Sequence, residues 1–257
     1  MARQFQEASS GSPAKLAPHG TLSEFYPVQA ERAGFVSDLF DRAAGDYDWM
    51  SGAMSFGTDR AYRRRVLEAA GLKPGMRVLD VASGTGLVAQ AALELGIAAG
   101  ELIGLDPSRG MLAENRKRHA IPLIQGLGEI LPFRNATFDF VVMAYALRHV
   151  EDLDRLFGEF HRVLRGPGRV LILEITCPSS RLGFGLMRFY LKRLLPFLTR
   201  LRTGHRDSAR LIEYYWATIA ECVPPSAILG TLSAAGFKLA ERRIIAGILS
   251  EYFAVKD

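Results

Sequence analysis

Hydrophobic residues in the middle of this chain form two alternating patterns: short unbroken runs, and longer segments in which they recur every three or four positions. The short runs are typical of buried strands and comprise VLDV at 78–81, ELIGLD at 101–106, PLIQG at 122–126, DFVVMA at 139–144 and GRVLILEI at 168–175. The longer segments predict helices over residues 87–95, 107–119 and 151–164. Strands separated by helices predict a mainly parallel sheet, in which ligands bind at the carboxyl ends of the strands.

The two ends of the chain depart from this alternation. Residues 1–32 include the low-complexity run ASSGSPAKLAPHG and have no periodic hydrophobic positions, so they are expected to form a flexible N-terminal tail. A single domain is expected over 33–257, with short helices before a longer helix that Asp59 caps. Residues 180–222 predict a helical lid inserted after the fifth strand, and residues 237–256 predict an antiparallel strand pair. The predicted fold is α/β, a Rossmann-like seven-stranded sheet with helices on both faces.

Composition adds few constraints. The chain has 257 residues, of which 49% are hydrophobic and 23% charged, as is ordinary for a globular protein. No hydrophobic run has the length of a membrane span and no signal core is present at the N-terminus, so a cytoplasmic location is expected. The cysteines Cys177 and Cys222 lack metal or redox spacing, and no metal site is predicted.

The net charge of +5 is concentrated in one segment. Between Ile175 and Arg206 there are seven basic residues and no acidic one, whereas acidic residues slightly outnumber basic ones elsewhere. A basic segment that is also apolar favours a membrane surface over nucleic acid as partner. An apolar face with helical spacing is predicted there, with Pro196 able to kink the helix, and it consists of Met187, Leu191, Leu194, Leu198 and Leu201. The segment could touch an anionic membrane, or it could pack on its own domain and leave a solvated basic face.

The segment VLDVASGTGLVA at 78–89 joins a strand, a glycine turn and a helix, as in nucleotide and nucleoside sites. By itself it also fits the dinucleotide pattern of NAD-dependent oxidoreductases. Asp106, at the end of the second strand, could accept hydrogen bonds from both ribose hydroxyls. Asp80 places a carboxylate beside the turn, where it would repel a pyrophosphate and attract a cationic amino group. The two carboxylates favour S-adenosylmethionine (SAM) over NAD.

Further motifs follow the glycine turn in order: GLDPSRGML, GEILPF, FDFVVMAYALRHV and HRVLRGPGRVLILEI. Together with VLDVASGTG they resemble class I SAM-dependent methyltransferases over residues 75–176. The upstream YDWMSGAMSFGTDR, Arg148 in ALRHV and the stretch FYLKRLLPF give a narrower likeness, over about residues 36–240, to the ubiquinone/menaquinone biosynthesis C-methyltransferase family. The resemblance implies SAM as cofactor and C-methylation of a quinol, phenol or similar apolar molecule.

The resemblance also implies a set of cofactor-binding residues around the glycine turn and the strand ends. They are Asp80, Ala82, Ser83, Gly84, Thr85, Gly86, Asp106, Pro107, Met111, Leu127, Gly128, Glu129 and Ala144. Leu127 stands where the family commonly has Asp or Asn for the adenine amino group, and Ala144 where it often has Ser. Loss of one such hydrogen bond would cost about 1 kcal/mol, which weakens a cofactor site without removing it.

Three residues are candidates for the chemistry of methyl transfer to a ring carbon. Arg148 could stabilise an oxyanion that develops on the ring, and His149, with a pKa near neutrality, could take the proton. Tyr47, in the loop before the core, could close over the substrate. Each residue also has a structural alternative: an ion pair for Arg148, a helix-start position for His149 and packing for Tyr47. An aromatic run at 214–216 could line the substrate slot or belong to the core.

Other functions remain open at this stage. The same fold could methylate oxygen, nitrogen or another carbon acid, because residues beyond the fifth strand shape the pocket. A SAM-binding protein that transfers no methyl group is favoured only by Leu127 and Ala144, and an NAD-dependent oxidoreductase is disfavoured by Asp80. The expected partner is an aromatic or lipid-like small molecule and not nucleic acid. A homodimer and peripheral membrane association stay open.

Overall fold

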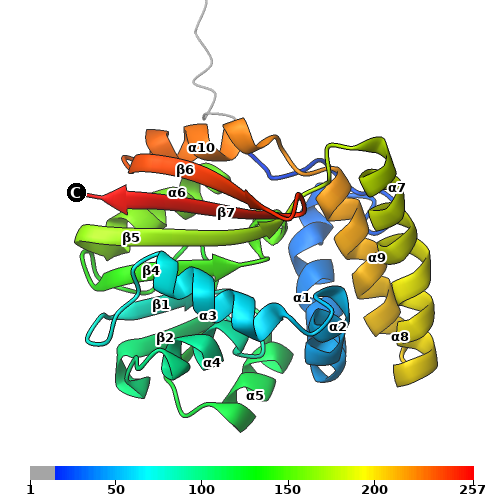
Figure 1. The fold of residues 1–257 in the computed structure, drawn as a ribbon, viewed down its shortest axis with the longest axis horizontal. Coiled ribbons are helices and arrows are strands. Elements are labelled where there is room, and N and C mark those ends of the chain that lie inside the picture. The colour runs from blue at the N-terminus through cyan, green and yellow to red at the C-terminus, as the bar shows by residue number, and fades with distance from the viewer. Residues whose placement is uncertain (1–14) are drawn as a thin grey trace, which may run out of the picture.

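The computed structural model describes residues 15–257 and contains a seven-stranded sheet with the strand order β3-β2-β1-β4-β5-β7-β6 (Figure 1). The first five strands are parallel, and β7 lies antiparallel between β5 and β6. The strands are β1 (Val78–Val81), β2 (Leu102–Asp106), β3 (Leu123–Gln125), β4 (Phe138–Ala144), β5 (Leu164–Ile175), β6 (Lys238–Ile245) and β7 (Leu249–Lys256). This arrangement confirms the predicted α/β fold class, including its C-terminal strand pair.

Helices cover both faces of the sheet. The helices that accompany the strands are α3 (Asp59–Ala69), α4 (Leu87–Glu94), α5 (Arg109–Arg118), α6 (Leu153–Val163) and α10 (Pro225–Ala234). Hydrophobic residues of α3 and α4 share one core with Val142, whereas those of α6 and α10 share another with Val141. These two valines are adjacent in β4, so they point to opposite faces of the sheet. The carboxyl ends of the strands are left for other segments to cover.

A third hydrophobic cluster lies in helices that gather at the end of the sheet where the parallel strands terminate (Figure 1). We call this group the helical cap. It consists of α1 (Arg32–Ala43), α2 (Tyr47–Met54), α7 (Arg181–Phe189), a π-helical turn (Tyr190–Leu194), α8 (Leu195–Thr203) and α9 (Arg206–Ala220). Leu39, Leu195 and Ile212, from three different helices, are fully buried in the cluster. The cap therefore has a core of its own above the predicted ligand site.

Residues 15–32 contact the folded domain, and Leu22, Phe25 and Tyr26 pack into the helical cap. The predicted flexible tail therefore extends too far. Tyr26 is 1% exposed, and 5.8 Å separates its ring centroid from that of Phe35. Arg32 is fully buried. Contacts with distant helices hold this segment, and a local hydrophobic period cannot reveal them. The remainder of the predicted tail, residues 1–14, lies outside the described residues.

Asp59 begins α3 but does not cap it, contrary to the prediction. The N-cap residue is Thr58, and the Asp59 carboxylate accepts a hydrogen bond from Nε of Arg63, one helical turn further on, at 2.8 Å. Both side chains of this ion pair are largely buried. The carboxylate therefore orients an arginine beneath the ligand site.

The residues of the predicted apolar face of the lid lie in two different environments. Leu191 is buried, but Leu194, Leu198 and Leu201 are exposed. The π-helical turn at Tyr190–Leu194 has more residues per turn than an α-helix, so it rotates the residues that follow it away from a regular three-four stripe. Within the part of the chain that the structure describes, no helix is long and apolar enough to cross a membrane.

Candidate active site

A cavity lies between the strand ends and the helical cap. It is lined by β1, β2 and β4 residues, by α1, and by the loops that follow β1, β2, β3 and β4. The cavity brings together eleven of the predicted site residues, which are Tyr47, Ala82, Gly84, Asp106, Pro107, Met111, Leu127, Gly128, Glu129, Ala144 and His149. The predicted residues Asp80, Ser83, Thr85, Gly86 and Arg148 do not line it.

The glycine turn after β1 is shaped by two glycines with left-handed backbone. Gly84 has φ +54° and Gly86 has φ +91°. A Cβ atom on Gly86 would lie 2.6 Å from Oδ1 of Asn115, so this position also requires close packing against α5. A Cβ on Gly84 would meet no atom within 4 Å, and Gly84 faces the cavity. Gly86 therefore supports the turn, while Gly84 leaves its ligand side open.

Asp106 ties this turn to the end of β2. One carboxylate oxygen accepts the N–H of Gly84 and the other accepts the N–H of Ser108, both at 2.8 Å. Burial raises the pKa of Asp106 to about 6, although these two N–H groups act to lower it. The residue lines the cavity, so its remaining lone pairs can accept hydrogen bonds from a ribose.

Asp80 is a buried acid beneath the turn. It is 1% exposed, and neither carboxylate oxygen has a hydrogen-bond partner among residues 15–257. Burial raises its pKa to about 8, and the nearby Arg63 guanidinium opposes this rise. A buried carboxyl group without partners is costly unless a ligand supplies a cation or a hydrogen-bond donor. The site therefore fits the cationic α-amino group of SAM, directly or through water.

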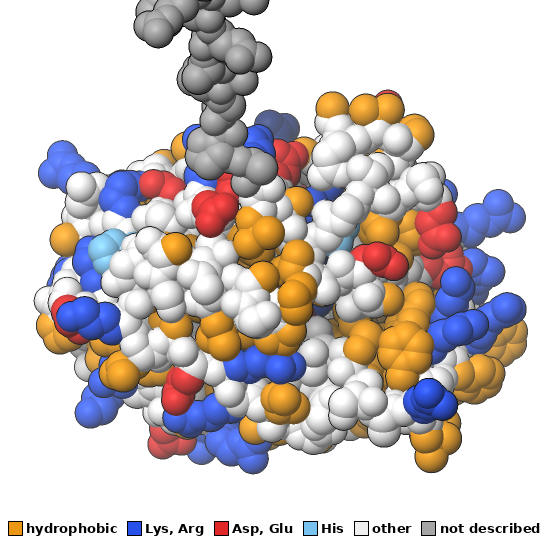
Figure 2. Space-filling model, turned by 90° about the horizontal axis from the view of Figure 1, so that it is seen from above, with side chains coloured by type: hydrophobic (Ala, Val, Ile, Leu, Met, Phe, Trp, Pro, Cys, Tyr) orange, Lys and Arg blue, Asp and Glu red, His pale blue; other side chains and the backbone are white. Residues whose placement is uncertain are grey.

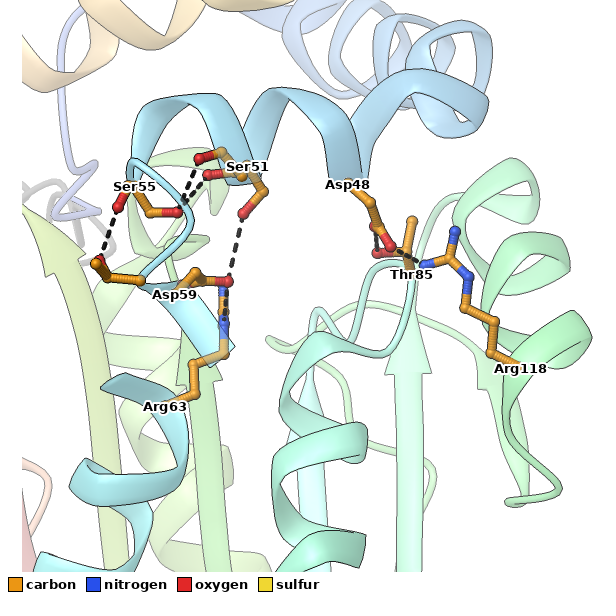
Figure 3. A network of polar contacts seen from close by, with 9 residues as sticks. Asp48, Ser51, Ser55, Asp59, Arg63, Thr85 and Arg118 are labelled. Atoms are coloured by element: carbon orange, nitrogen blue, oxygen red, sulfur yellow. Dashed lines mark hydrogen bonds and ion pairs between the residues drawn. The ribbon is translucent and has the colours of Figure 1, made fainter. Parts of the chain in front are cut away.

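Thr85 faces the helical cap and not the cavity. Figure 3 shows its hydroxyl donating to the carboxylate of Asp48 in α2, which also pairs with Arg118 of α5. The same figure shows Asp59 between Ser51 and Arg63, further along α2 towards its other end. The guanidinium carbon of Arg63 lies 4.8 Å from the ring centroid of Tyr145, which lines the cavity. Polar contacts thus fasten α2 over the glycine turn.

The far wall of the cavity is formed by the loop after β3. Leu127 is 48% exposed and offers no polar side-chain group, and a Cβ on Gly128 would lie 2.7 Å from Cδ1 of Leu156. The Glu129 carboxylate accepts the N–H of Glu151 at 2.7 Å, so it braces two loops against each other. Adenine would therefore meet mainly apolar surface and backbone groups here.

His149 lies in the cavity wall, enclosed by aromatic rings. It stacks on Tyr214 and Tyr215 at centroid distances of 5.4 and 5.7 Å, and Phe40 approaches it edge-on. Burial, followed by the positive charges of Arg148 and Arg32, lowers its pKa well below the ordinary 6.5. The expected pKa near neutrality is wrong, and the imidazole is neutral at physiological pH. Both ring nitrogens are buried, and neither has a hydrogen-bond partner among the described residues.

Arg148 is fully buried and does not reach the cavity. Its guanidinium pairs with Glu174 of β5, donates to Thr218 of α9 at 3.2 Å and lies over the ring of Tyr215. Arg148 therefore forms a structural ion pair, which was the alternative to a catalytic role in the sequence analysis. Direct stabilisation of a substrate oxyanion by Arg148 does not agree with this position, because the side chain lies behind the aromatic wall. Its charge still acts on His149.

Tyr47 lines the cavity, whereas the aromatic residues at 214–216 do not. Tyr47 lines the cavity beside Phe40, as expected for a residue that contacts substrate. Burial raises the pKa of the Tyr47 hydroxyl, so this residue is a neutral hydrogen-bonding group. Tyr214, Tyr215 and Trp216 are buried in the cap and do not line the cavity. Tyr214 and Tyr215 support His149 by stacking on it.

Several residues of this site carry no signal in the sequence. Val36, Ser37 and Phe40 of α1 line the cavity, as does Lys15. They come from the two N-terminal segments without strand and helix alternation. The only local feature of the sequence here is the apolar spacing in VSDLF, and this spacing does not indicate which part of the protein these residues pack against.

The sheet order, the glycine turn and the two acids at the ends of β1 and β2 define a class I SAM-dependent methyltransferase. The chain belongs to the ubiE/COQ5 methyltransferase family, which matches residues 27–256. It is therefore an S-adenosylmethionine-dependent methyltransferase, and the predictions of enzyme class and cofactor are confirmed.

Relatives of known name agree with this assignment. The chain is 33% identical to the ubiquinone/menaquinone biosynthesis C-methyltransferase of Cellvibrio japonicus, across 90% of this chain and 94% of that protein. It is 37% identical to the demethylmenaquinone methyltransferase of Corynebacterium efficiens, across 67% and 74% respectively. A SAM-dependent methyltransferase structure from Thermotoga maritima matches with a TM-score of 0.59 at 19% identity, covering 86% of this chain and 99% of that one. This last likeness concerns the fold alone.

Proposed function

We propose that this enzyme transfers a methyl group from SAM to a ring carbon of a quinol with an apolar tail. The observation that carries the proposal is the division of one cavity into two chemically different ends. One end has Asp106 in its wall and the buried Asp80 beneath the adjoining glycine turn, and the other has His149 and Tyr47 among aromatic rings. The names of the related quinone-pathway enzymes support the same substrate class.

The acidic end suits the cofactor. Asp106 would accept the ribose hydroxyls, Met111 and Leu127 would contact adenine, and Asp80 would face the amino group. When bound, SAM supplies an electrophilic methyl group on a positively charged sulfur. The chain holds no metal-ligand cluster among residues 15–257, and none is needed for this displacement.

The aromatic end suits a quinol ring. A ring carbon becomes nucleophilic when a neighbouring hydroxyl loses its proton, and the neutral imidazole of His149 can accept a hydrogen bond from that hydroxyl. When the ring carbon takes the methyl group, its own hydrogen leaves as a proton, for which the imidazole is an acceptor. Tyr47 can donate to the other ring oxygen. Phe40 and His149 exclude water from the ring, which protects the reactive anion.

A methyl-transfer assay tests the substrate class. Radiolabelled SAM is incubated with reduced demethylmenaquinone analogues, with simple catechols and with primary amines. We expect label on carbon of the quinols only. Label on oxygen or nitrogen would replace the proposal by the corresponding methyltransferase, and SAM binding without any labelled product would favour a protein that does not transfer methyl.

We further propose that α7 and α8 contact an anionic membrane, from which a tailed quinol could enter. Five hydrophobic side chains of these helices are more than half exposed, namely Leu182, Leu186, Phe189, Phe197 and Leu201. Figure 2 shows hydrophobic side chains beside Lys and Arg on the side of the molecule where Figure 1 draws these helices. Exposed apolar groups next to cations suit an acidic lipid surface. The oligomeric state is a separate question, and a homodimer of this chain remains a prediction from the sequence.

Vesicle co-sedimentation tests the membrane contact. Leu186→Asp with Phe189→Asp should reduce binding to phosphatidylglycerol vesicles at least tenfold, whereas Leu239→Asp, on the equally exposed β6, should not. Arg188→Glu with Lys192→Glu should act similarly, with Arg64→Glu and Arg65→Glu of α3 as the control. Equal binding by all four variants would contradict the contact.

A further inference from the structure

Arg32, the first residue of α1, is a buried cation without a counter-ion. Its side chain is fully buried, and no carboxylate among residues 15–257 lies within ion-pair distance of it. Nη2 donates to the backbone carbonyl of Arg148 at 2.8 Å and contacts Nε2 of His19 at 3.0 Å. Nε and Nη1 have no acceptor among the described residues. An unpaired buried charge is costly, so its persistence calls for a role.

His19 contacts this cation with a ring nitrogen that accepts a hydrogen bond. Its Nδ1 lies 2.7 Å from the carbonyl oxygen of Gly20 and so carries the hydrogen, which leaves Nε2 as the acceptor for Arg32. Burial, with the positive charge of Arg32, lowers the pKa of His19 to about 4. The ring is therefore neutral and adds no charge of its own.

The remaining groups around His149 do not neutralise Arg32 either. Arg148 and Glu174 compensate each other, and burial raises the pKa values of Tyr47, Tyr214 and Tyr215, so that these hydroxyls stay uncharged. The charges of Arg148 and Arg32 and the ring of His19 act on His149, and Tyr214 and Tyr215 stack on it. Arg148 in turn pairs with Glu174. The sum over all these groups is one positive charge behind the aromatic end of the cavity.

We propose that Arg32 is a positioning residue that fixes the turn carrying His149 and supplies the positive charge that favours an ionised hydroxyl on the bound substrate. The hydrogen bond to the Arg148 carbonyl holds the turn Leu147–His149 one residue before the imidazole. The charge attracts a ring oxyanion through a low-dielectric wall and keeps the imidazole neutral. The cavity then has a cation-binding end and an anion-favouring end, matching a sulfonium donor and an anionic nucleophile. This inference rests on the proposed methylation of a hydroxylated ring.

Two substitutions separate charge from geometry. Arg32→Met removes both, and Arg32→Lys keeps the charge but loses the rigid guanidinium whose Nη2 contacts Arg148 and His19 together. Arg169→Met is the control, because its guanidinium also donates to a backbone carbonyl, of Ala70 at 2.9 Å, but lies at the opposite end of the sheet. Circular dichroism and SAM calorimetry should show folded proteins with nearly unchanged cofactor affinity.

The pH dependence of kcat/KM for quinol methylation gives the first readout. In Arg32→Met the rise of kcat/KM with pH should move upward by about one pH unit, with kcat reduced at least tenfold and KM changed much less. In Arg32→Lys kcat should fall while the pH profile keeps its position. A profile in Arg32→Met that coincides with that of Arg169→Met would overturn the proposal, as would a displaced profile in Arg32→Lys.

Histidine titration by NMR in the cofactor-free protein gives a second readout that needs no turnover. The midpoint of His149 should rise in Arg32→Met and stay near the wild-type value in Arg32→Lys and Arg169→Met. An unchanged midpoint in Arg32→Met overturns the charge role. If the midpoint moves but wild-type enzyme methylates no quinol, the proposed substrate class fails while the charge behind His149 stands. Should Arg32→Met not fold, Arg32→Gln takes its place in both measurements.

Discussion

The two ends of the cavity are built in different ways. The cofactor end is made by β1, the glycine turn and β2, whose residues lie within 30 positions of one another and whose key bonds join Asp106 to Gly84 and Ser108. The substrate end is assembled from α1, α2, the turn before α6 and the support of α9, which are far apart in the chain. Local sequence therefore determines the cofactor end, whereas long-range packing determines the substrate end.

The largest expected effect concerns the support of the substrate end. Glu174→Gln leaves the Arg148 guanidinium buried without its carboxylate, and breaking a buried pair in this way costs about 3–5 kcal/mol. The free energy of unfolding, measured by urea titration, should fall by that amount. The exposed pair of Arg200 and Glu213 provides the control, since Glu213→Gln should change stability by less than about 1 kcal/mol. Similar losses in both variants would show that burial does not distinguish the pairs.

A smaller effect is expected in the glycine turn of the cofactor end. Gly86→Ala forces a Cβ to within 2.6 Å of Asn115 Oδ1 in addition to the cost of left-handed backbone, together about 2 kcal/mol. Gly84→Ala has the backbone cost alone, about 1 kcal/mol, because nothing lies within 4 Å of its Cβ. Thermal unfolding of both variants measures the difference. Equal losses would mean that α5 moves freely away from the turn.

Asp80 should make SAM affinity and stability depend on pH in opposite directions. Its pKa is about 8 in the folded protein against an ordinary 3.8, so between these values the folded protein binds a proton that the unfolded chain has released. Stability should therefore fall as pH rises from about 4 to about 8, while SAM, which needs the ionised carboxylate, should bind more tightly.

Asp80→Asn tests this linkage. The variant should lose both trends and bind SAM about tenfold more weakly at pH 8 in calorimetry. Asp139→Asn is the control, since this carboxylate accepts the N–H of Arg77 at the amino end of β4. Retention of the wild-type pH trends by Asp80→Asn would assign them to another group.

The smallest expected effect is a gain at the adenine wall. Leu127→Asn would restore a side chain that can bond the adenine amino group, which should tighten SAM binding by about 1 kcal/mol, roughly fivefold. Leu127→Ala distinguishes this bond from simple removal of an exposed leucine and should not tighten binding. If the two variants bind SAM equally, residue 127 does not reach the cofactor.

These differences explain what the sequence could predict. The strands and the roles of Gly84 and Asp106 follow from unbroken apolar runs and turn residues that act over a few positions. The low pKa of His149 could not be predicted, because it depends on burial and on the charges of Arg148 and Arg32. Arg32 itself stands in a segment without periodic hydrophobic positions, and only the folded cap shows that it is buried.

The packing of residues 15–32 has a practical consequence for protein engineering. A shortened chain that begins at residue 33, the boundary suggested by hydrophobic periodicity, would lack His19 and Arg32 and also Lys15, which lines the cavity. Such a truncated protein would keep the sheet and the glycine turn intact. It would be expected to bind the cofactor while losing turnover, and so to be mistaken for a binding protein in a screen that scores SAM alone.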